Sequence, residues 1–278
     1  MSQVPSITLN NGVEMPQLGF GVWQVPDTEA TKAVRTAIES GYRSIDTAAI
    51  YENEQGTGKA IADSGVAREE LFVTTKLWNS QQGYDTTLRA FDASLDKLGL
   101  DYVDLYLIHW PVPAKDADID TYRAFEKIYA DGRAKAIGVS NFLPEHLERL
   151  IGETSVVPVI NQIELHPQLQ QAESRAFHAK HDIATEAWSP LGQGKGLLEV
   201  PTVVAIAQKH GRTPAQVVLR WHIQTGNVVI PKSVTPSRIA ENLDVFGFEL
   251  DADDLAAFAA LDEGKRLGPN PGEFNVGA

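Results

Sequence analysis

Three short apolar stretches of this sequence end on a side chain that can carry charge or move a proton. Asp46 ends the first, Lys76 the second and His109 the third, and Tyr51 adds a phenol five residues after Asp46. An ionised side chain is costly to bury without a partner, so these positions indicate a site rather than packing. The two later residues are candidate partners for Asp46 and Tyr51.

Together these residues could deliver a proton. An isolated tyrosine has a pKa near about 10, and a nearby lysine cation stabilises its phenolate and lowers that value. We therefore expect Lys76 to lower the pKa of Tyr51, and Asp46 to pair with Lys76 and keep it charged. The alternative is that Asp46 and Lys76 form only a structural ion pair.

The elements that position these residues repeat one pattern: a short apolar strand, a loop, and an amphipathic helix. Eight such units favour a parallel (β/α)₈ TIM barrel of the α/β class. The strands are expected at Phe20–Trp23, Ser44–Asp46, Phe72–Lys76, Val103–His109, Lys135–Ser140, Val159–Glu164, Ala184–Ser189 and Val228–Lys232. The helices are expected near Thr28–Ser40, Glu54–Ser64, Thr86–Leu98, Ile119–Asp131, Pro144–Gly152, Gln171–His181, Pro201–His210 with Pro214–Thr225, and Pro236–Val245.

Further elements are expected at the two ends of the chain. Ser6–Leu9 and Glu14–Leu18 flank an Asn-Gly turn, which predicts an N-terminal β-hairpin because both turn residues tolerate positive φ. An extra C-terminal helix begins near Leu250–Leu255 with three aspartates, for which helix capping is favoured over a metal site. No Pro/Gly/Ser-rich linker or charge break divides residues 1–278, so we expect a single domain.

The polar residues at the ends of the strands favour a closed barrel over an open sheet. In a barrel, the carboxyl ends of all strands form one rim, where the active site is expected, whereas an open sheet concentrates its ligand groups at one switch point. The expected rim residues are Asp46, Lys76, His109, Ser140, Asn141, Gln162, Ser189 and Lys232.

The composition of the chain excludes several classes of partner and chemistry. A net charge of −13 opposes binding to nucleic acid or to an anionic membrane, because both need clustered positive charge. The absence of cysteine excludes disulfides and thiolate chemistry and is compatible with a reducing compartment. Met1–Pro5 lacks the pattern of a secretory signal, and no apolar run could span a bilayer, so we expect a cytoplasmic protein.

One segment could bind the phosphate of a dinucleotide, although no glycine-rich dinucleotide fingerprint is present. Thr235 can cap a helix that begins at Pro236, which places Arg238 in the first turn beside unpaired backbone N–H groups and opposite Lys232. Two cations, hydroxyls and a helix N-terminus would then converge. The alternative is an ordinary charged and solvated helix start.

Other rim positions could hold a ring and a carboxamide. Ser140, Asn141 and Gln162 provide the donors and acceptors that a carboxamide requires, with Trp188 nearby. Singly, Asn141 could instead cap the helix at Pro144, and Trp188 could lie in the core. Trp23, Trp78 and Trp110 lie near strand ends and could form an apolar pocket wall.

Two histidine positions offer weaker signals. His178 and His181 have the spacing of one helix face, but without a third ligand nearby a solvated face is the better interpretation than a metal site. His166 is expected to be structural.

The order of Asp46, Tyr51, Lys76 and His109 resembles the catalytic tetrad of the aldo-keto reductases. The resemblance runs from Gly19–Trp23 to Pro231–Ser233 and the pair Glu241-Asn242, covers nearly the whole chain, and is nearest to the bacterial 2,5-diketo-D-gluconate reductase branch. One departure is Thr57, where the family usually has an aliphatic residue; it touches packing rather than chemistry. Another is Thr235, where close relatives often carry a basic residue.

The resemblance implies NADPH as the cofactor and a small carbonyl compound as the substrate, with Tyr51 as proton donor and His109 orienting the carbonyl oxygen. It also implies a protein without a metal, which we expect to be a monomer. The implied substrate pocket contains Trp23, Trp78, His109 and Trp110. The implied cofactor residues are Ser140, Asn141, Gln162, Trp188, Ser189, Leu191, Lys232, Ser233, Val234, Arg238, Glu241 and Asn242.

The sequence thus favours an NADPH-dependent reductase of aldehydes and ketones, with diketo-sugar acids as the leading substrate class. One rival is a regulatory subunit that binds NADPH with little catalysis. A second rival is a barrel hydrolase or isomerase that uses Asp46 and Glu164 and binds no dinucleotide.

Overall fold

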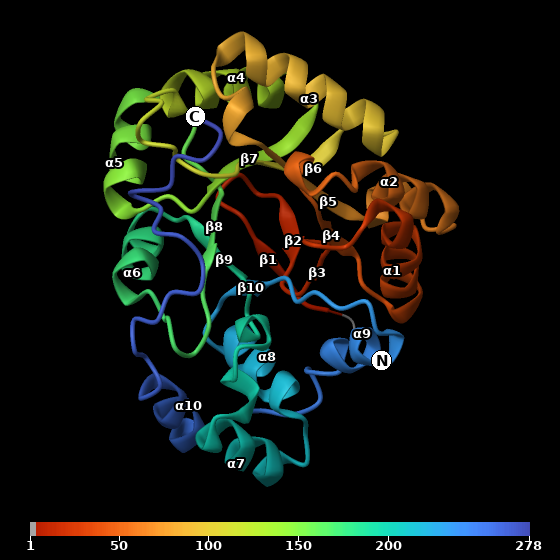
Figure 1. The fold of residues 1–278 in the computed structure, drawn as a ribbon, viewed down its shortest axis with the longest axis vertical. Coiled ribbons are helices and arrows are strands. Elements are labelled where there is room, and N and C mark those ends of the chain that lie inside the picture. The colour runs from red at the N-terminus through yellow and green to blue at the C-terminus, as the bar shows by residue number, and fades with distance from the viewer. Residues whose placement is uncertain (1–3) are drawn as a thin grey trace.

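The computed structural model describes residues 4–278 and shows a parallel barrel surrounded by helices (Figure 1). Neighbouring strands pair in the order β10-β9-β8-β7-β6-β5-β4-β3. The strands are β3 (Phe20–Gly21), β4 (Ser44–Asp46), β5 (Phe72–Leu77), β6 (Val103–Ile108), β7 (Ala134–Ser140), β8 (Ile160–Glu164), β9 (Ala184–Trp188) and β10 (Val228–Val229). The expected (β/α)₈ fold is confirmed.

Backbone hydrogen bonds between the first and last strands close the barrel. The N–H of Gly19 donates to the carbonyl of Val229 at 2.9 Å, and the N–H of Gly21 donates to the carbonyl of Pro231 at 3.2 Å. The last strand is shorter than the sequence predicts because Pro231 has no N–H to donate to a ladder. The closed ring brings the first and last strand ends to the same rim.

The helices follow the strands as expected, with ends that differ by a few residues. Short 3₁₀ turns also occur in the loops, among them η1 (Ala49–Tyr51), which carries Tyr51. The α-helices are α1 (Asp27–Ser40), α2 (Glu54–Asp63), α3 (Tyr84–Leu98), α4 (Asp118–Ala130), α5 (Pro144–Glu153), α6 (Ala172–Lys180), α7 (Pro201–His210), α8 (Pro214–Gln224), α9 (Pro236–Leu243) and α10 (Ala252–Ala259).

The expected hairpin and the expected helix cap are both present. Strands β1 (Ser6–Thr8) and β2 (Glu14–Pro16) pair antiparallel, which confirms the N-terminal hairpin. At the other end, the Asp251 carboxylate accepts the N–H of Asp254 at 3.0 Å and caps α10, as expected.

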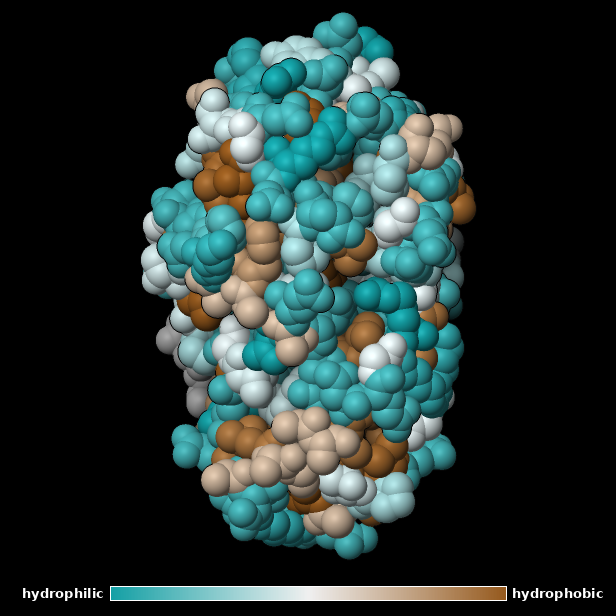
Figure 2. All heavy atoms as spheres, turned by 90° about the vertical axis from the view of Figure 1, so that its left-hand side faces the viewer, coloured by the Kyte–Doolittle hydropathy of each residue, from teal (hydrophilic) through white to brown (hydrophobic). Residues whose placement is uncertain are grey.

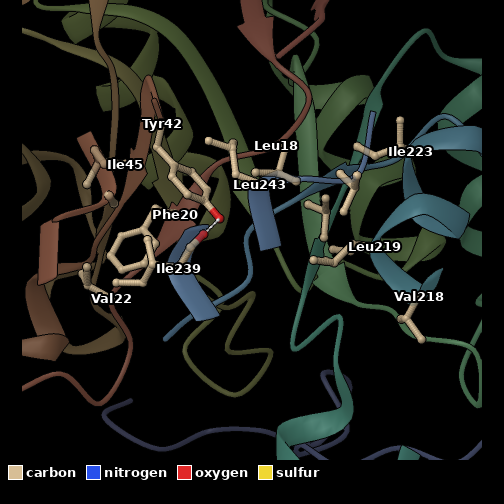
Figure 3. Packing of buried hydrophobic residues seen from close by; sticks show 14 of the residues in the cluster. Leu18, Phe20, Val22, Tyr42, Ile45, Val218, Leu219, Ile223, Ile239 and Leu243 are labelled. Carbon is tan, nitrogen blue, oxygen red and sulfur yellow. Dashed lines mark hydrogen bonds between the residues drawn. The ribbon is translucent and has the colours of Figure 1, made fainter. Parts of the chain in front are cut away.

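A buried cluster of apolar side chains fixes α9 against the barrel (Figure 3). Phe20 and Ile45 of the first two barrel strands pack in the same cluster as Ile239 and Leu243 of α9. The Tyr42 hydroxyl donates to the carbonyl of Ile239 at 3.1 Å, so this buried hydroxyl is satisfied. This packing sets the position of the N-terminal turn of α9, which carries Arg238.

One sequence expectation about α6 is wrong. His178 does not lie on a solvated helix face, because its side chain is fully buried. Its ring nitrogens contact the Asn161 amide and the Thr185 hydroxyl, each at 2.9 Å. Two neighbouring strands supply these partners, and the sequence alone does not show which helix face they meet. The expected structural role of His166 agrees with its burial and its 3.0 Å contact to Glu164.

The outer surface is largely polar on the side that carries α5 and α6, with scattered apolar groups and a broader apolar band near the bottom of the view (Figure 2). Among residues 4–278, no helix is both long and apolar enough to cross a bilayer. Residues 1–3 of the segment considered for a signal lie outside the described part of the chain.

Candidate active site

A cavity of about 1070 Å³ opens at the carboxyl ends of the barrel strands. This volume exceeds the usual range of about 300–1,000 Å³ for small-ligand pockets. The structure brings nearly all of the expected site residues to its wall: Trp23, Asp46, Tyr51, Trp78, His109, Trp110, Ser140, Asn141, Gln162, Trp188, Ser189, Leu191, Lys232, Ser233, Arg238, Glu241 and Asn242.

Two expected residues lie elsewhere. Val234 is outside the cavity wall and is 47% exposed. Lys76 lies behind the wall, where its side chain is fully buried.

Lys76 is held in this buried position by Asp46 of the adjacent strand. Its Nζ donates to Asp46 Oδ1 at 2.6 Å and to the carbonyl of Thr47 at 2.9 Å. Burial by itself lowers the pKa of Lys76, but the opposite charge of Asp46 outweighs burial, so the pKa is raised above its ordinary value. The side chain therefore remains an ammonium at neutral pH.

The ammonium of Lys76 lies 5.1 Å from the centroid of the Tyr51 ring. The expected net fall in the pKa of Tyr51 does not occur: burial raises this pKa more than the Lys76 cation lowers it. Tyr51 therefore keeps its proton at neutral pH, which is the form a proton donor needs. The sequence places the two residues together but does not reveal that Tyr51 is fully desolvated.

His109 lies beside Tyr51 and is a neutral imidazole. Burial, and to a lesser extent the Lys76 cation, hold its pKa well below the ordinary value of 6.5. Its Nδ1 is buried without a partner among residues 4–278, so Nε2 is the ring nitrogen available to the cavity. The ring centroid lies 5.6 Å from that of Tyr51 and 5.4 Å from that of Trp78.

A buried network fixes the amide of Gln162. Its Nε2 donates to Asp46 Oδ2 at 2.9 Å and to Glu186 Oε2 at 2.8 Å. Because an amide nitrogen carries only two protons, both are used, and the carbonyl oxygen of Gln162 is left for the cavity that it lines. Glu186 was not among the expected site residues, because only the strand register shows that it lies opposite Gln162.

Asn141 and Trp188 are joined at the rim. The Trp188 indole N–H donates to Asn141 Oδ1 at 2.8 Å, and the Asn141 amide nitrogen donates to the carbonyl of His109 at 2.9 Å. Asn141 does not cap α5, whose N-cap residue is Leu143. Trp188 lines the cavity instead of entering the core. The alternatives that the single residues left open are thus not realised.

At the far end of the cavity, Lys232 and Arg238 form what we call the cation patch. Both side chains are exposed, and within residues 4–278 neither pairs with a carboxylate. Helix α9 begins at Pro236 as predicted. The expected side-chain cap from Thr235 is absent; instead, the Thr235 N–H donates to the Ser233 hydroxyl at 3.1 Å.

The C-terminal tail forms part of the wall and is anchored by Glu164. Its Oε1 accepts the N–H of Leu267 at 2.6 Å, and its Oε2 accepts the N–H of Gly268 at 2.9 Å. Burial alone would raise the pKa of Glu164, but hydrogen bonds from His166 and the tail outweigh burial and lower it. A Cβ at residue 268 would come within 2.6 Å of Trp188, so glycine permits this close approach.

Other wall residues carry no chemical signal in the sequence, because they are apolar, small, or on loops whose shape depends on the fold. They are Gly21, Gln24, Ile50, Pro190, Gln193, Gly194, Leu198, Thr213, Pro214, Ala215, Ile230, Pro231, Leu267, Gly268 and Pro269.

Comparison with known proteins gives the family of the chain. The model of the aldo/keto reductase family matches residues 16–263. An aldo-keto reductase from Mycolicibacterium smegmatis is 61% identical over 271 residues, which cover 98% of each chain. Methylglyoxal reductase DkgA from Escherichia coli K12 is 54% identical over 275 residues, or 99% of each chain. The crystal structure of a Gox0644 mutant in complex with NADPH has a TM-score of 0.94 at 52% identity and covers 99% of each chain.

The chain belongs to the aldo-keto reductase family. As a member, it is an NADPH-dependent oxidoreductase that acts on carbonyl groups. The residues present fit this cofactor, because one cavity joins an amide oxygen at Gln162 to two exposed cations without carboxylate partners in the described chain.

Proposed function

We propose that this protein reduces small, uncharged α-dicarbonyl compounds with NADPH. The observation that carries the proposal is the distribution of charge on the cavity wall. Among residues 4–278, Lys232 and Arg238 are the only lysine and arginine side chains on the wall, and both belong to the cation patch. The tryptophan end, near Trp23, Trp78 and Trp110, offers rings and neutral donors to a substrate.

This distribution favours one substrate class over the other. A diketo-sugar acid would bring a carboxylate to the tryptophan end, where no wall cation among residues 4–278 would compensate for its lost hydration. A neutral α-dicarbonyl needs only apolar contact and a hydrogen-bond donor at its reacting oxygen. The relative named methylglyoxal reductase supports this order, and diketo-sugar acids remain the second candidate.

For the cofactor, we propose that the cation patch and Ser233 bind the 2′-phosphate of NADPH. Glu241 and Asn242 would then contact the adenine. At the other end Ser140, Asn141 and the oxygen of Gln162 that is left for the cavity would hold the carboxamide, and Trp188 would lie against the nicotinamide ring. Ser189, Leu191 and Val234 complete the proposed cofactor residues. The bound cofactor supplies the hydride that reduces the carbonyl carbon.

For the proton, we propose Tyr51 as the donor. The carbonyl oxygen of the substrate would gain negative charge during reduction, and it would take the phenolic proton of Tyr51. Lys76 then stabilises the phenolate, while Asp46 keeps Lys76 charged and oriented. Neutral His109 donates a hydrogen bond from Nε2 to the same oxygen and positions it.

Steady-state oxidation of NADPH with a panel of carbonyl compounds tests the proposal. We expect the highest kcat/KM with methylglyoxal and other neutral α-dicarbonyls, and lower values with 2,5-diketo-D-gluconate. A higher value for the sugar acid would reverse the substrate order. Tight NADPH binding without turnover on any carbonyl would support the regulatory-subunit rival instead.

A further inference from the structure

Glu186 is an acid at the centre of the barrel that the proposed mechanism does not use. It lies on β9 and is 1% exposed. Its Oε2 accepts one hydrogen bond from Gln162 at 2.8 Å, and its Oε1 is buried with no partner among residues 4–278. A carboxylate with a single hydrogen bond in such a place is strongly disfavoured, whereas a neutral carboxylic acid is not.

The charges around Glu186 do not compensate for a second carboxylate. Gln162 bridges Glu186 to Asp46, which already pairs with the Lys76 ammonium at 2.6 Å. If both acids were ionised, two carboxylates would share one cation. Burial, followed by repulsion from Asp46, raises the pKa of Glu186 to about 8, while Gln162 and Lys76 lower it less.

The groups that face Glu186 come from several elements. The ionisable groups that interact electrostatically with Glu186 are Asp46 of β4, Lys76 of β5 and Tyr51 of η1. In the strand register, Glu186 lies opposite Gln162 on β8 and opposite Val228 on β10. On β8, the carboxylate of Glu164 is instead bound to His166 and the tail.

We propose that Glu186 is a positioning residue that works as a neutral acid: it holds the Gln162 amide, leaves Lys76 paired with Asp46 alone, and weakens Tyr51 as a donor when it ionises. The proposal rests on the proposed role of Tyr51. Ionised Glu186 adds a negative charge that disfavours the Tyr51 phenolate and raises its pKa. Because proton donation produces that phenolate, reduction slows as pH rises through the titration of Glu186.

The variant Glu186→Gln separates charge from position. Glutamine keeps an oxygen that can accept from Gln162 but cannot ionise. We expect the variant to match the parent at about pH 6.5, because Glu186 is uncharged there and both side chains can accept the hydrogen bond from Gln162. At about pH 9 the parent should fall toward a tenth of its plateau kcat, since about nine-tenths of an acid of pKa about 8 is ionised there, whereas the variant should keep its rate.

Two further variants are controls. Glu186→Asp retains an ionisable acid and should restore an alkaline decline in kcat. Glu54→Gln changes another buried glutamate, which lies on α2 and accepts from the Thr75 hydroxyl at 2.6 Å. It should leave the pH profile of kcat as in the parent, whatever it does to stability.

A direct titration covers the case in which Glu186→Gln does not fold. Infrared spectra of the parent protein, with and without NADPH, should contain a protonated-carboxyl band that disappears between about pH 7 and pH 9 and has a midpoint near about 8. Isotope labelling of glutamate shows that the band comes from a glutamate, its persistence in Glu54→Gln excludes Glu54, and its shift in Glu186→Asp assigns it to Glu186.

Several results would overturn the proposal. They are a pH profile of Glu186→Gln that superimposes on the parent's, an inactive Glu186→Gln that still binds NADPH, or a carboxyl band that is absent at neutral pH. Failure of the underlying function looks different: Tyr51→Phe would keep its activity while the carboxyl band still titrated.

Discussion

The two ends of the cavity are built in opposite ways. At the tetrad end, Lys76 is fully buried, contacts Asp46 and Thr47, and has its ammonium 5.1 Å from the centroid of the Tyr51 ring. At the cation patch, Lys232 and Arg238 are exposed and have no carboxylate partner in residues 4–278. The cation of the first end is therefore shielded from solvent, whereas the two cations of the second end are exposed to it.

This difference assigns different work to the two ends. Groups that act on developing charge are most effective when they are fixed and desolvated in advance, because they need no reorganisation during reaction. Groups that recognise a phosphate gain selectivity from pairing with it, and exposure lets the phosphate enter from solvent. We therefore expect changes at the tetrad end to affect turnover and stability, and changes at the cation patch to affect binding.

The largest effect is expected from Tyr51→Phe. The ring and its packing remain, but the proton that neutralises the alkoxide is lost, so kcat should fall by at least about 10²–10⁴-fold. NADPH binding, measured by fluorescence quenching, should be unchanged. A variant that binds NADPH and retains more than about a tenth of the parent kcat would show that the proton comes from another group, with His109 the next candidate.

Lys76→Met should reduce kcat strongly and also lower stability. It leaves the Asp46 carboxylate buried without its cation, which costs about 3–5 kcal/mol in comparable buried pairs. The double variant Lys76→Met/Asp46→Asn removes that uncompensated charge, so its melting temperature should recover in part while kcat stays low. Recovery of kcat together with stability would mean that Lys76 serves only the fold.

Arg238→Ala should raise the NADPH dissociation constant by about ten- to a hundredfold, because a charge-assisted contact worth about 1.5–3 kcal/mol is lost. NADH, which lacks the phosphate, should bind as before. Arg212→Ala is a matched control, since Arg212 pairs with Asp244 at 2.7 Å and lies outside the cavity wall. Equal losses of affinity for NADPH and NADH would show that the cation patch does not bind the 2′-phosphate.

His109→Gln should lower kcat by up to about tenfold, because an amide can still donate one hydrogen bond to the carbonyl oxygen. We expect the neutral imidazole of His109 to be the active form. Because burial holds the pKa of His109 well below 6.5, protonation should reduce kcat only at still lower pH. A rate profile for the parent from about pH 8 down to about pH 6 should therefore lack a histidine limb. A decline centred near the ordinary histidine pKa would contradict the burial argument.

The smallest effect is expected from Glu164→Gln. One tail N–H loses its charged acceptor, while the amide oxygen can still accept the other. We expect KM for the carbonyl substrate to rise a few-fold with kcat nearly unchanged, since the tail lines the pocket but lies outside the tetrad. A fall in kcat as large as the rise in KM would contradict this, because it would mean that the tail stabilises the transition state.

Much of this architecture could be predicted from the sequence because it depends on local periodicity. Eight strand–helix units and the polar residues at the strand ends follow from short-range patterns, and these define the barrel and bring Asp46, Tyr51 and His109 to one rim. Helix α9 was likewise predictable from Thr-Pro at its start.

What the sequence did not predict depends on contacts between distant segments. Glu186 acquires its partners through strand register and through Asp46 of another strand, and Glu164 through a tail more than a hundred residues away. Burial of His178 depends on which helix face meets the barrel. The net direction of the Tyr51 pKa depends on complete desolvation, which exceeds the effect of the neighbouring cation.

We propose that the tetrad end carries out the reduction and the cation patch binds the phosphate of NADPH, and that the two ends act independently. A double-mutant cycle for NADPH binding tests it: the dissociation constant is measured for the parent, Tyr51→Phe, Arg238→Ala and the double variant. We predict that Arg238→Ala raises the constant by the same factor in both backgrounds, within about 0.5 kcal/mol, as for independent sites. A coupling energy above about 1 kcal/mol would contradict the account, because the two ends would then act as one unit.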